Sequence, residues 1–172
     1  MTFRIAGPRD IPALHRLIEG AYRGDSAKAG WTHEADLLGG QRTDAQALGD
    51  IIADDAQVVL LLEAGGDLQG CVLVADKGGG RAYLGMLTVR PDLQSAGIGA
   101  KLLDEAEDLA RNVLQARTME MTVIKRRREL IEWYERRGYE NTGREAPFPK
   151  DDPRFGLPKV DDLVFVVLEK AL

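Results

Sequence analysis

The sequence has a single cysteine, Cys71, and only two histidines, His15 and His33. One cysteine excludes an intramolecular disulfide, and no group of cysteines and histidines has the spacing of metal ligands. Cys71 lies in the apolar run 71–74, where a cysteine is more often a small buried side chain than a reactive thiol. We therefore expect neither a disulfide-stabilised protein nor a metal cofactor.

A long hydrophobic segment is also missing, because no stretch of 18 or more apolar residues occurs and a membrane-spanning helix needs about that length. The first residues are polar and lack the basic-then-apolar order of a secretion signal. We expect a cytoplasmic protein with no membrane partner. The length of 172 residues and the 44% hydrophobic content suit one domain over residues 1–172 with a full core.

Positive charge is in deficit, since 23 Lys and Arg residues face 28 Asp and Glu residues, for a net charge of −5. Affinity for nucleic acid depends largely on clustered cations. The balance therefore argues against a nucleic-acid partner. The basic run 125–128 is short and isolated, and we expect it to precede a helix beside a ligand or to lie in a solvated turn.

The most informative segment is 89–100, where an apolar strand pattern passes through a glycine-containing turn into a long amphipathic helix. The first N–H groups of a helix have no intrahelical partner and carry partial positive charge, so glycines there let a phosphate approach the backbone. The spacing is neither that of a nucleoside-triphosphate loop nor that of the dinucleotide fingerprint, whose third glycine is missing. What remains is Gln-x-x-Gly-x-Gly-Ala, formed by Gln94, Gly97, Gly99 and Ala100.

A second motif follows in the segment 129–139, which contains Tyr134 and ends in Gly138-Tyr139. The two motifs in this order resemble the acetyl-CoA-binding motif and the later helix of the GCN5-related N-acetyltransferase (GNAT) superfamily. The chain is similar to this family along its whole length, and it looks like a bacterial member of the small-molecule type.

The resemblance implies an α/β (α+β) fold, with a mixed, mostly antiparallel sheet of about six or seven strands, splayed at the cofactor site, and helices on both faces. The periodicity of the chain agrees with that fold. It predicts strands at residues 3–6, 57–64, 68–76, 81–89, 118–124, 140–144 and 163–169, and helices at 10–21, 43–53, 102–113 and 128–137. Gly65 and Gly66 predict a tight hairpin turn, and Gly138 predicts the end of the last helix.

The resemblance also implies that acetyl-CoA lies between the strand that ends at Val89 and the strand that starts near Thr118. Its pantetheine arm would pair with the backbone of Leu87 and Val89. Arg127 stands where many relatives have an asparagine at the cofactor arm, and it is expected to meet a phosphate or an acidic acceptor. The pyrophosphate would receive backbone N–H groups from Gln94, Ser95, Ala96, Gly97, Ile98, Gly99 and Ala100, with side-chain donors from Gln94 and Ser95.

Acetyl transfer to an amine needs a neutral nucleophile, a stabilised oxyanion and a proton for the departing thiolate. Tyr134 matches the helix tyrosine of the family, which implies the role of proton donor; packing within its helix is the alternative. The simplest hydrogen-bond donor to the oxyanion is a backbone N–H of the strand near Leu87.

The general base is open, because the strand 81–89 lacks the carboxylate that many relatives carry there. The candidates are Glu120, on the strand across the splay, and Glu34, in the loop 22–42 that is expected to line the acceptor site. Thr88 or Thr122 holding a water is the alternative.

The acceptor site is expected to be lined by the loops 22–42 and 146–158, with Trp31, Glu34 and Arg42 as candidate acceptor-binding residues. The leading hypothesis is acetyl transfer to a primary amine of a small molecule. A protein N-terminus or lysine is a second acceptor class, and a non-catalytic acyl-CoA-binding regulatory module is a third reading. Homodimers are common in the family that the chain resembles.

Overall fold

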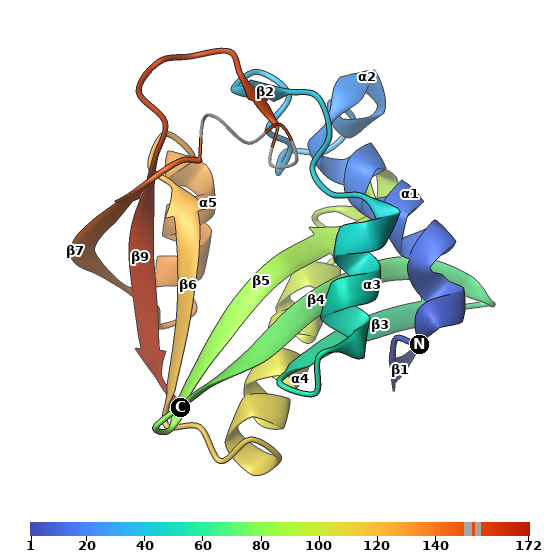
Figure 1. The fold of residues 1–172 in the computed structure, drawn as a ribbon, viewed down its shortest axis with the longest axis vertical. Helices are drawn as coiled ribbons and strands as arrows, with labels where there is room; N and C mark the ends of the chain where they lie inside the picture. Colours follow the sequence, from blue (N-terminus) through green and yellow to red (C-terminus); the bar gives the residue numbers. More distant parts are fainter. Residues whose placement is uncertain (150–152, 154–155) are drawn as a thin grey trace.

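The computed structural model describes residues 1–149, 153 and 156–172. Within these residues, seven strands form one sheet in the order β1-β3-β4-β5-β6-β9-β7, and β2 and β8 form a separate pair (Figure 1). Only β5 and β6 run parallel among these paired strands, so the predicted mixed, mostly antiparallel sheet is confirmed. The strands are β1 (Thr2–Ile5), β2 (Leu38–Gly39), β3 (Gln57–Ala64), β4 (Asp67–Gly78), β5 (Arg81–Val89), β6 (Thr118–Ile124), β7 (Glu140–Pro147), β8 (Leu157–Pro158) and β9 (Val164–Ala171).

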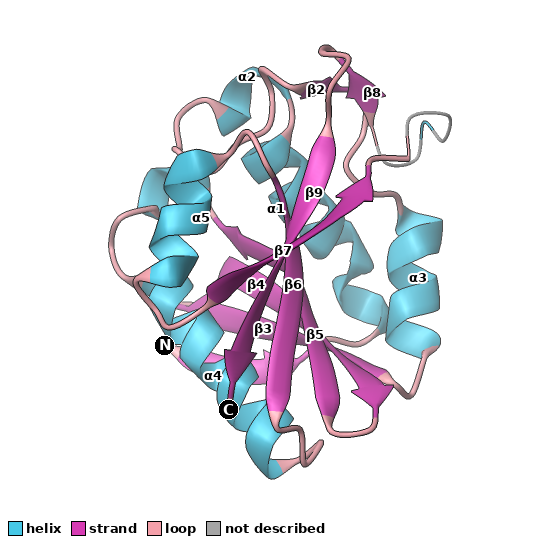
Figure 2. Cartoon of the chain, turned by 90° about the vertical axis from the view of Figure 1, so that its left-hand side faces the viewer, coloured by secondary structure: helices cyan, strands magenta, loops and turns pink. Residues whose placement is uncertain are grey.

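Helices cover both faces of the sheet, as expected (Figure 2). The helices are α1 (Ile11–Tyr22), α2 (Gly24–Ala27), α3 (Ala45–Ala53), α4 (Ile98–Asn112) and α5 (Arg128–Glu135), with short 3-10 turns at Pro8–Asp10 and Pro91–Leu93. Buried side chains recur every three or four residues along α1 and α4, which is the spacing of one helix face. The α1 and α3 side chains pack in one core cluster, and those of α4 and α5 pack in another on the opposite face.

Local sequence signals set several element ends. Gly65 and Gly66 both have positive φ, +61° and +86°, as the tight β3–β4 hairpin requires. The Asp44 carboxylate accepts a hydrogen bond from Ala47 N at 2.7 Å and caps α3. Gly138, with φ of +92°, reverses the chain after α5, which ends at Glu135 rather than at residue 137. The predicted end of this helix is therefore confirmed within two residues.

A β-bulge interrupts β5 at residues 86–87, where the backbone changes direction. Thr88 lies opposite Cys71 on β4, and Gly85 lies opposite Leu73. Residues 86–87 of β5 therefore stand against a single residue of β4, which defines the bulge.

The bulge reverses which face of the sheet the β5 side chains occupy. Before it, Ala82 and Leu84 belong to the core under α4, whereas Met86 belongs to the core under α1. After it, Leu87 and Val89 face α4 again. Met86 has φ of +49°, a rare value for a residue with a side chain. This local strain gives the backbone of β5 a new direction at the bulge.

β5 and β6 separate soon after they meet. They pair over three residues only, Arg81–Tyr83 against Thr118–Glu120. Figure 1 shows the two strands close together at their starts and far apart at their other ends. The expected splay is therefore present, and it opens toward the β5 bulge.

A small roof covers the open end of the splay. β2 pairs with β8, and Lys159 N donates to Leu37 O at 2.8 Å, so the loop before α3 is joined to the loop after β7. Beneath this pair, Leu38, Ile124, Phe148 and Leu163 form a third buried cluster. The proline-rich loop predicted over 146–158 lies partly outside the described residues, which omit 150–152 and 154–155.

In the part of the chain that the structure describes, no helix is both long and apolar enough to span a bilayer. Cys71 is fully buried, which confirms its expected role as a small core side chain. Burial raises the pKa of its thiol to about 12, so it is not a thiolate near neutral pH.

Gly70 allows β4, β5 and α4 to approach one another. A Cβ at this position would lie 2.6 Å from Thr88 O and 2.7 Å from Leu102 Cδ1. We expect Gly70→Ala to lower the free energy of unfolding by about 1–3 kcal/mol in urea titrations, because it overpacks this contact. Gly20→Ala is the matched control, since its Cβ meets no atom within 4 Å and it lies inside α1; it should not destabilise. Equal effects of the two variants would contradict this account of Gly70.

Candidate active site

Two cavities lie side by side where β5 and β6 separate. We call the first the arginine cavity, of about 300 Å³, whose charged wall is formed by Arg23, Glu34, Arg42 and Arg127. We call the second the glycine-loop cavity, of about 330 Å³, whose wall includes Gln94, Ser95, Gly97, Gly99 and Ala100. The cavities share the wall residues Tyr22, Leu87, Arg127, Leu130 and Tyr134. A ligand in one cavity therefore reaches a ligand in the other at this shared wall.

The glycine-loop cavity has the backbone of an anion site. Ser95 and Gly97 have positive φ, +72° and +78°, and Gly97 precedes α4 without a side-chain cap. The first N–H groups of α4 thus have no intrahelical or capping partner, which suits a phosphate. Ile98 is a core residue with 3% of its surface exposed, so only its backbone is available. Ala96 is exposed and does not line the cavity.

Gln94 has a role that the motif did not reveal. Its Oε1 accepts hydrogen bonds from Trp31 N at 2.8 Å and Thr32 N at 3.3 Å. Its Nε2 donates to Thr32 Oγ1 at 2.7 Å and Val89 O at 3.3 Å. The side chain is therefore committed to fastening the loop 30–34 to the glycine turn, and the structure does not support its expected use as a phosphate donor. Gly30 leaves room for this contact, because a Cβ there would lie 2.4 Å from Gln94 Oε1.

Arg127 fastens the same loop from the other side. Its guanidinium donates to Thr32 O and, at 3.2 Å, to Glu34 Oε1, and its side chain is only 10% exposed. Arg127 lies on the wall shared by both cavities, so it remains within reach of either ligand.

Glu34 is the carboxylate of the arginine cavity, and it is buried between Arg23 and Arg127. Burial by itself raises the pKa of a carboxyl group, but here the charges of Arg127, Arg42 and Arg23 outweigh it, so the pKa of Glu34 lies below its ordinary value. A carboxylate with a lowered pKa is a weak base. The surroundings of Glu34 therefore suit a positioning group better than the predicted base.

Tyr134 sits at the junction of the two cavities. It is 5% exposed, and its ring packs edge-on against Trp133 and Tyr139. No described residue forms a hydrogen bond with its hydroxyl, whereas the hydroxyl of Tyr139 donates to Glu107 at 3.0 Å. Burial raises the pKa of Tyr134, so the phenol is protonated over the whole neutral range.

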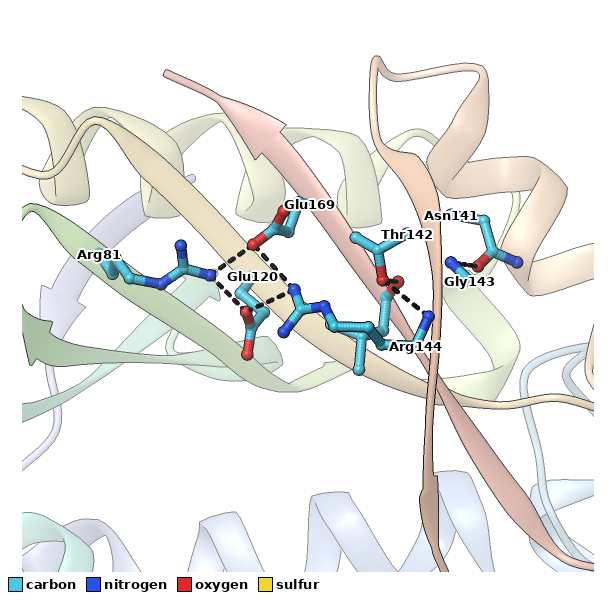
Figure 3. A network of polar contacts seen from close by, with 8 residues as sticks. Arg81, Glu120, Asn141, Thr142, Gly143, Arg144 and Glu169 are labelled. Carbon is cyan, nitrogen blue, oxygen red and sulfur yellow. Dashed lines mark hydrogen bonds and ion pairs between the residues drawn. The ribbon is translucent and has the colours of Figure 1, made fainter.

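Glu120 is a correction. It lies in the closed part of the splay, paired with Tyr83, and it lines neither cavity. Its carboxylate accepts hydrogen bonds from Arg81 at 2.6 Å and Arg144 at 3.3 Å (Figure 3). Glu169 completes this surface network through the same two arginines. The network leaves Glu120 too far along β6 to serve as the base of a reaction at the cavity junction.

The two threonines considered as water holders differ. Thr88 is 1% exposed, donates to Met86 O at 2.8 Å and lines neither cavity. Thr122 lies in the arginine cavity, and its hydroxyl is 2.8 Å from that of Tyr83. Only Thr122 is placed to hold a water there.

The three expected acceptor residues do not share one cavity. Glu34 and Arg42 line the arginine cavity, whereas Trp31 lines the glycine-loop cavity. Tyr22, which sequence reasoning missed, lines both cavities, and its hydroxyl donates to Leu87 O. Tyr22 lies at the end of the apolar face of α1, where the sequence indicates only a packed side chain.

Trp133 was expected to be a core residue, but it also lines the glycine-loop cavity, where the Arg137 guanidinium stacks on its ring at 3.7 Å. Tyr139 is a core residue as expected. Among the described residues, no group of three His, Cys, Asp or Glu side chains is arranged to hold a metal ion.

Residues 13–139 match the family model of the acetyltransferase (GNAT) family. Solved structures similar to the whole chain include a ribosomal-protein-alanine N-acetyltransferase from Brucella melitensis, with 17% identity, 100% of both chains covered and a TM-score of 0.74. YncA, a putative acetyltransferase from Salmonella typhimurium solved with acetyl-CoA, has 19% identity, 100% and 94% coverage and a TM-score of 0.71. A spermidine N-acetyltransferase from Vibrio cholerae has 14% identity, 99% and 95% coverage and a TM-score of 0.69. No curated protein sequence matches the chain.

The role of Gln94 can be measured by hydrogen exchange. Gln94→Ala removes the acceptor of Trp31 N and Thr32 N, so we expect these amides to exchange about 5-fold faster, which corresponds to the loss of about 1 kcal/mol. Gln46→Ala is the control, because among the described residues the Gln46 side-chain amide bonds only to Asp50, on the exposed face of α3. Unchanged exchange in the loop of the Gln94 variant would rule out the fastening role.

The buried charge cluster predicts a pH-dependent stability. Glu34→Gln removes the carboxylate that pairs with both Arg23 and Arg127, and we expect it to cost about 3 kcal/mol at pH 7. Because the folded pKa of Glu34 lies below its ordinary value of 4.5, the advantage of the natural protein is complete above that value and is lost as the pH falls through the folded pKa.

Urea titrations from pH 7 to pH 3 measure this difference. Glu145→Gln is the control, because Glu145 forms an exposed pair with Lys125, which is worth about 0–1 kcal/mol. A difference between the natural protein and Glu34→Gln that stays constant down to pH 3 would contradict the assignment of the ionised carboxylate.

Proposed function

The chain belongs to the GNAT acetyltransferase family, and we propose that it transfers an acetyl group from acetyl-CoA to the primary amine of a small molecule. One observation carries the proposal. The cavity of the glycine turn, whose backbone suits an anion, and the arginine cavity meet at a shared wall that includes Leu87, Arg127 and Tyr134. This is the arrangement that direct transfer between two bound substrates requires.

The residues present fit acetyl-CoA. The uncapped start of α4, with Ser95 and Gly97 in left-handed conformations, would hold the pyrophosphate through backbone N–H groups. The separated edges of β5 and β6 leave backbone groups near Leu87 and Val89 that would pair with the pantetheine amides, as a neighbouring strand does. Arg137, stacked on Trp133, adds positive charge to this cavity.

Acetyl-CoA supplies the acetyl group as a thioester. The amine nitrogen forms the new C–N bond, the C–S bond breaks, and the thiolate must take up one proton while the amine loses one. Tyr134 lines both cavities and keeps its proton at neutral pH, but burial raises its pKa and makes it a weak acid. We therefore assign to it proton donation to the sulfur that is concerted with C–S cleavage, after which it regains a proton from solvent. A backbone N–H of the β5 bulge near Leu87 would stabilise the oxyanion.

The amine must be neutral to react, which costs roughly 4.6 kcal/mol for an alkyl ammonium of pKa about 10.4 at pH 7. The guanidinium groups of Arg42 and Arg127 in the wall of the arginine cavity would reduce this cost, because nearby positive charge disfavours the ammonium form. We assign the departing proton to a water held by the hydroxyl pair of Tyr83 and Thr122.

The roof favours a small acceptor. Phe148 lines the arginine cavity and packs with Leu38 of β2 in the cluster beneath the β2–β8 pair, so this pair would limit the space for a peptide beside the cavity. A protein N-terminus or lysine needs an open groove, and the volume of about 300 Å³ suits a single small molecule.

The proton-donor role is tested with Tyr134→Phe. We expect kcat to fall by about 100-fold, the lower range for a general acid, while the affinity for acetyl-CoA in calorimetry changes little. Tyr139→Phe is the matched control: it removes a buried hydroxyl that bonds to Glu107 outside both cavities, so stability should fall and turnover should persist.

The assay is release of free CoA thiol from acetyl-CoA across amines, amino acids, polyamines and short peptides. Turnover in Tyr134→Phe equal to that of the natural protein would remove the acid role. Binding of acetyl-CoA without release to any acceptor would favour a regulatory acyl-CoA-binding module, and absence of binding would overturn the cofactor site.

A further inference from the structure

The two carbonyl groups of the β5 bulge are held by side chains from three elements. Met86 O accepts a hydrogen bond from Thr88 Oγ1, on β5 itself, at 2.8 Å, and a weaker one from Cys71 Sγ, on β4, at 3.7 Å. Leu87 O accepts a hydrogen bond from the hydroxyl of Tyr22, at the end of α1. The two peptide units that flank Leu87 are therefore both fixed.

These contacts set the direction of the Leu87 N–H. A trans peptide unit is planar, so its C=O and N–H groups point to opposite sides. Met86 O points toward Cys71 on β4, and the Leu87 N–H therefore points to the other side of β5, where β6 follows in the sheet order. Among the described strands, β6 pairs with β5 only over Arg81–Tyr83. The Leu87 N–H thus faces the opening between the two strands, at the wall shared by both cavities.

We propose that Thr88 is a positioning residue for acetyl transfer: its hydroxyl fixes the Met86–Leu87 peptide unit and so aims the Leu87 N–H at the thioester oxygen of acetyl-CoA. The inference rests on the proposed function and adds to it a side chain that lines neither cavity. When the amine attacks, this oxygen gains negative charge, and the charge is lost again as the C–S bond breaks. A donor that is already aimed stabilises that charge without having to turn first.

The surroundings of Thr88 suit this role. The residue is 1% exposed, and the neighbouring Cys71 and Met86 side chains belong to an apolar cluster. A valine has nearly the same shape and would suit these neighbours, so the hydroxyl is explained by its carbonyl partner. Met86 has φ of +49°, which is rare for a residue with a side chain and persists only where surrounding contacts hold it. Loss of the hydroxyl would free the peptide unit to rotate.

Thr88→Val tests the inference in the thiol-release assay. We expect kcat to fall by about 10-fold, less than the loss of about 100-fold or more that follows removal of an oxyanion donor itself, with unchanged affinity for acetyl-CoA. Thr88→Ser keeps the hydroxyl and should keep most of kcat. Thr142→Val is the matched control, because the Thr142 hydroxyl also donates to a backbone carbonyl, that of Val167, at 2.8 Å, but outside both cavities.

Infrared difference spectra report the hydrogen bond without any acceptor. Acetyl-CoA isotopically labelled at the thioester carbonyl is bound to each protein, and a stronger hydrogen bond to the oxygen lowers the stretching frequency. We expect a higher frequency on Thr88→Val than on the natural protein, Thr88→Ser and Thr142→Val. A purely structural role of Thr88 would lower stability and leave this frequency unchanged. Equal kcat and equal frequency in a folded Thr88→Val protein would overturn the inference while leaving acetyl transfer intact.

The outcomes separate the inference from the proposed function. If acetyl-CoA binds but no acceptor releases CoA, the proposed transfer fails, and the frequency difference alone decides whether Thr88 aims the donor. If Thr88→Val does not fold, the amide proton resonance of Leu87 in the natural protein decides: it should move downfield when acetyl-CoA binds, and an unchanged resonance would reject the inference. Absence of acetyl-CoA binding would overturn both.

Discussion

The early separation of β5 from β6 is the constraint on which the site depends. Two parallel strands that pair over three residues and then diverge leave N–H and C=O groups without strand partners in the middle of a sheet. Such groups must find other partners or face a ligand. Tyr22 takes up one of them, the carbonyl of Leu87, and the bulge residues Met86 and Leu87 line the arginine cavity. Packing of the α4 side chains against the sheet stabilises the fold although β5 and β6 are separated there.

The two cavities are coupled through one loop. Gln94, on the glycine turn, and Arg127, before α5, both bind the segment around Thr32. Glu34, two residues further on, carries the charge balance of the arginine cavity. A displacement of the glycine turn would therefore act on the wall of the arginine cavity through a few direct hydrogen bonds. The same contacts give the loop 30–34 a fixed position although it has no strand or helix of its own.

Local signals predicted the strands and helices, the family resemblance implied how the sheet is arranged, and the site was predictable only in part. Alternation predicted β5 and β6 to the residue, whereas the helical spacing over 102–113 missed the first four residues of α4, which begins at Ile98 within the glycine motif. Glu120 was wrongly taken as a base. It lies on β6 as predicted, but it still pairs with β5, and the residue at which β6 separates from β5 depends on β5, which lies far away in sequence. The roles of Gln94 and Tyr22 arise from pairings over more than 60 residues. No periodicity within one segment reports such contacts.

The arginines of the arginine cavity bear on the proposed chemistry through one electrostatic effect. Guanidinium groups beside a bound amine disfavour its ammonium form, so Arg42 and Arg127, which line the cavity, would lower the cost of the neutral nucleophile that the proposed transfer needs. Glu34 lies in the same wall, and a carboxylate has the opposite effect on a nearby ammonium. Its ion pairs with Arg23 and Arg127 direct its negative charge toward guanidinium groups, and these pairs would therefore help to keep a bound amine neutral.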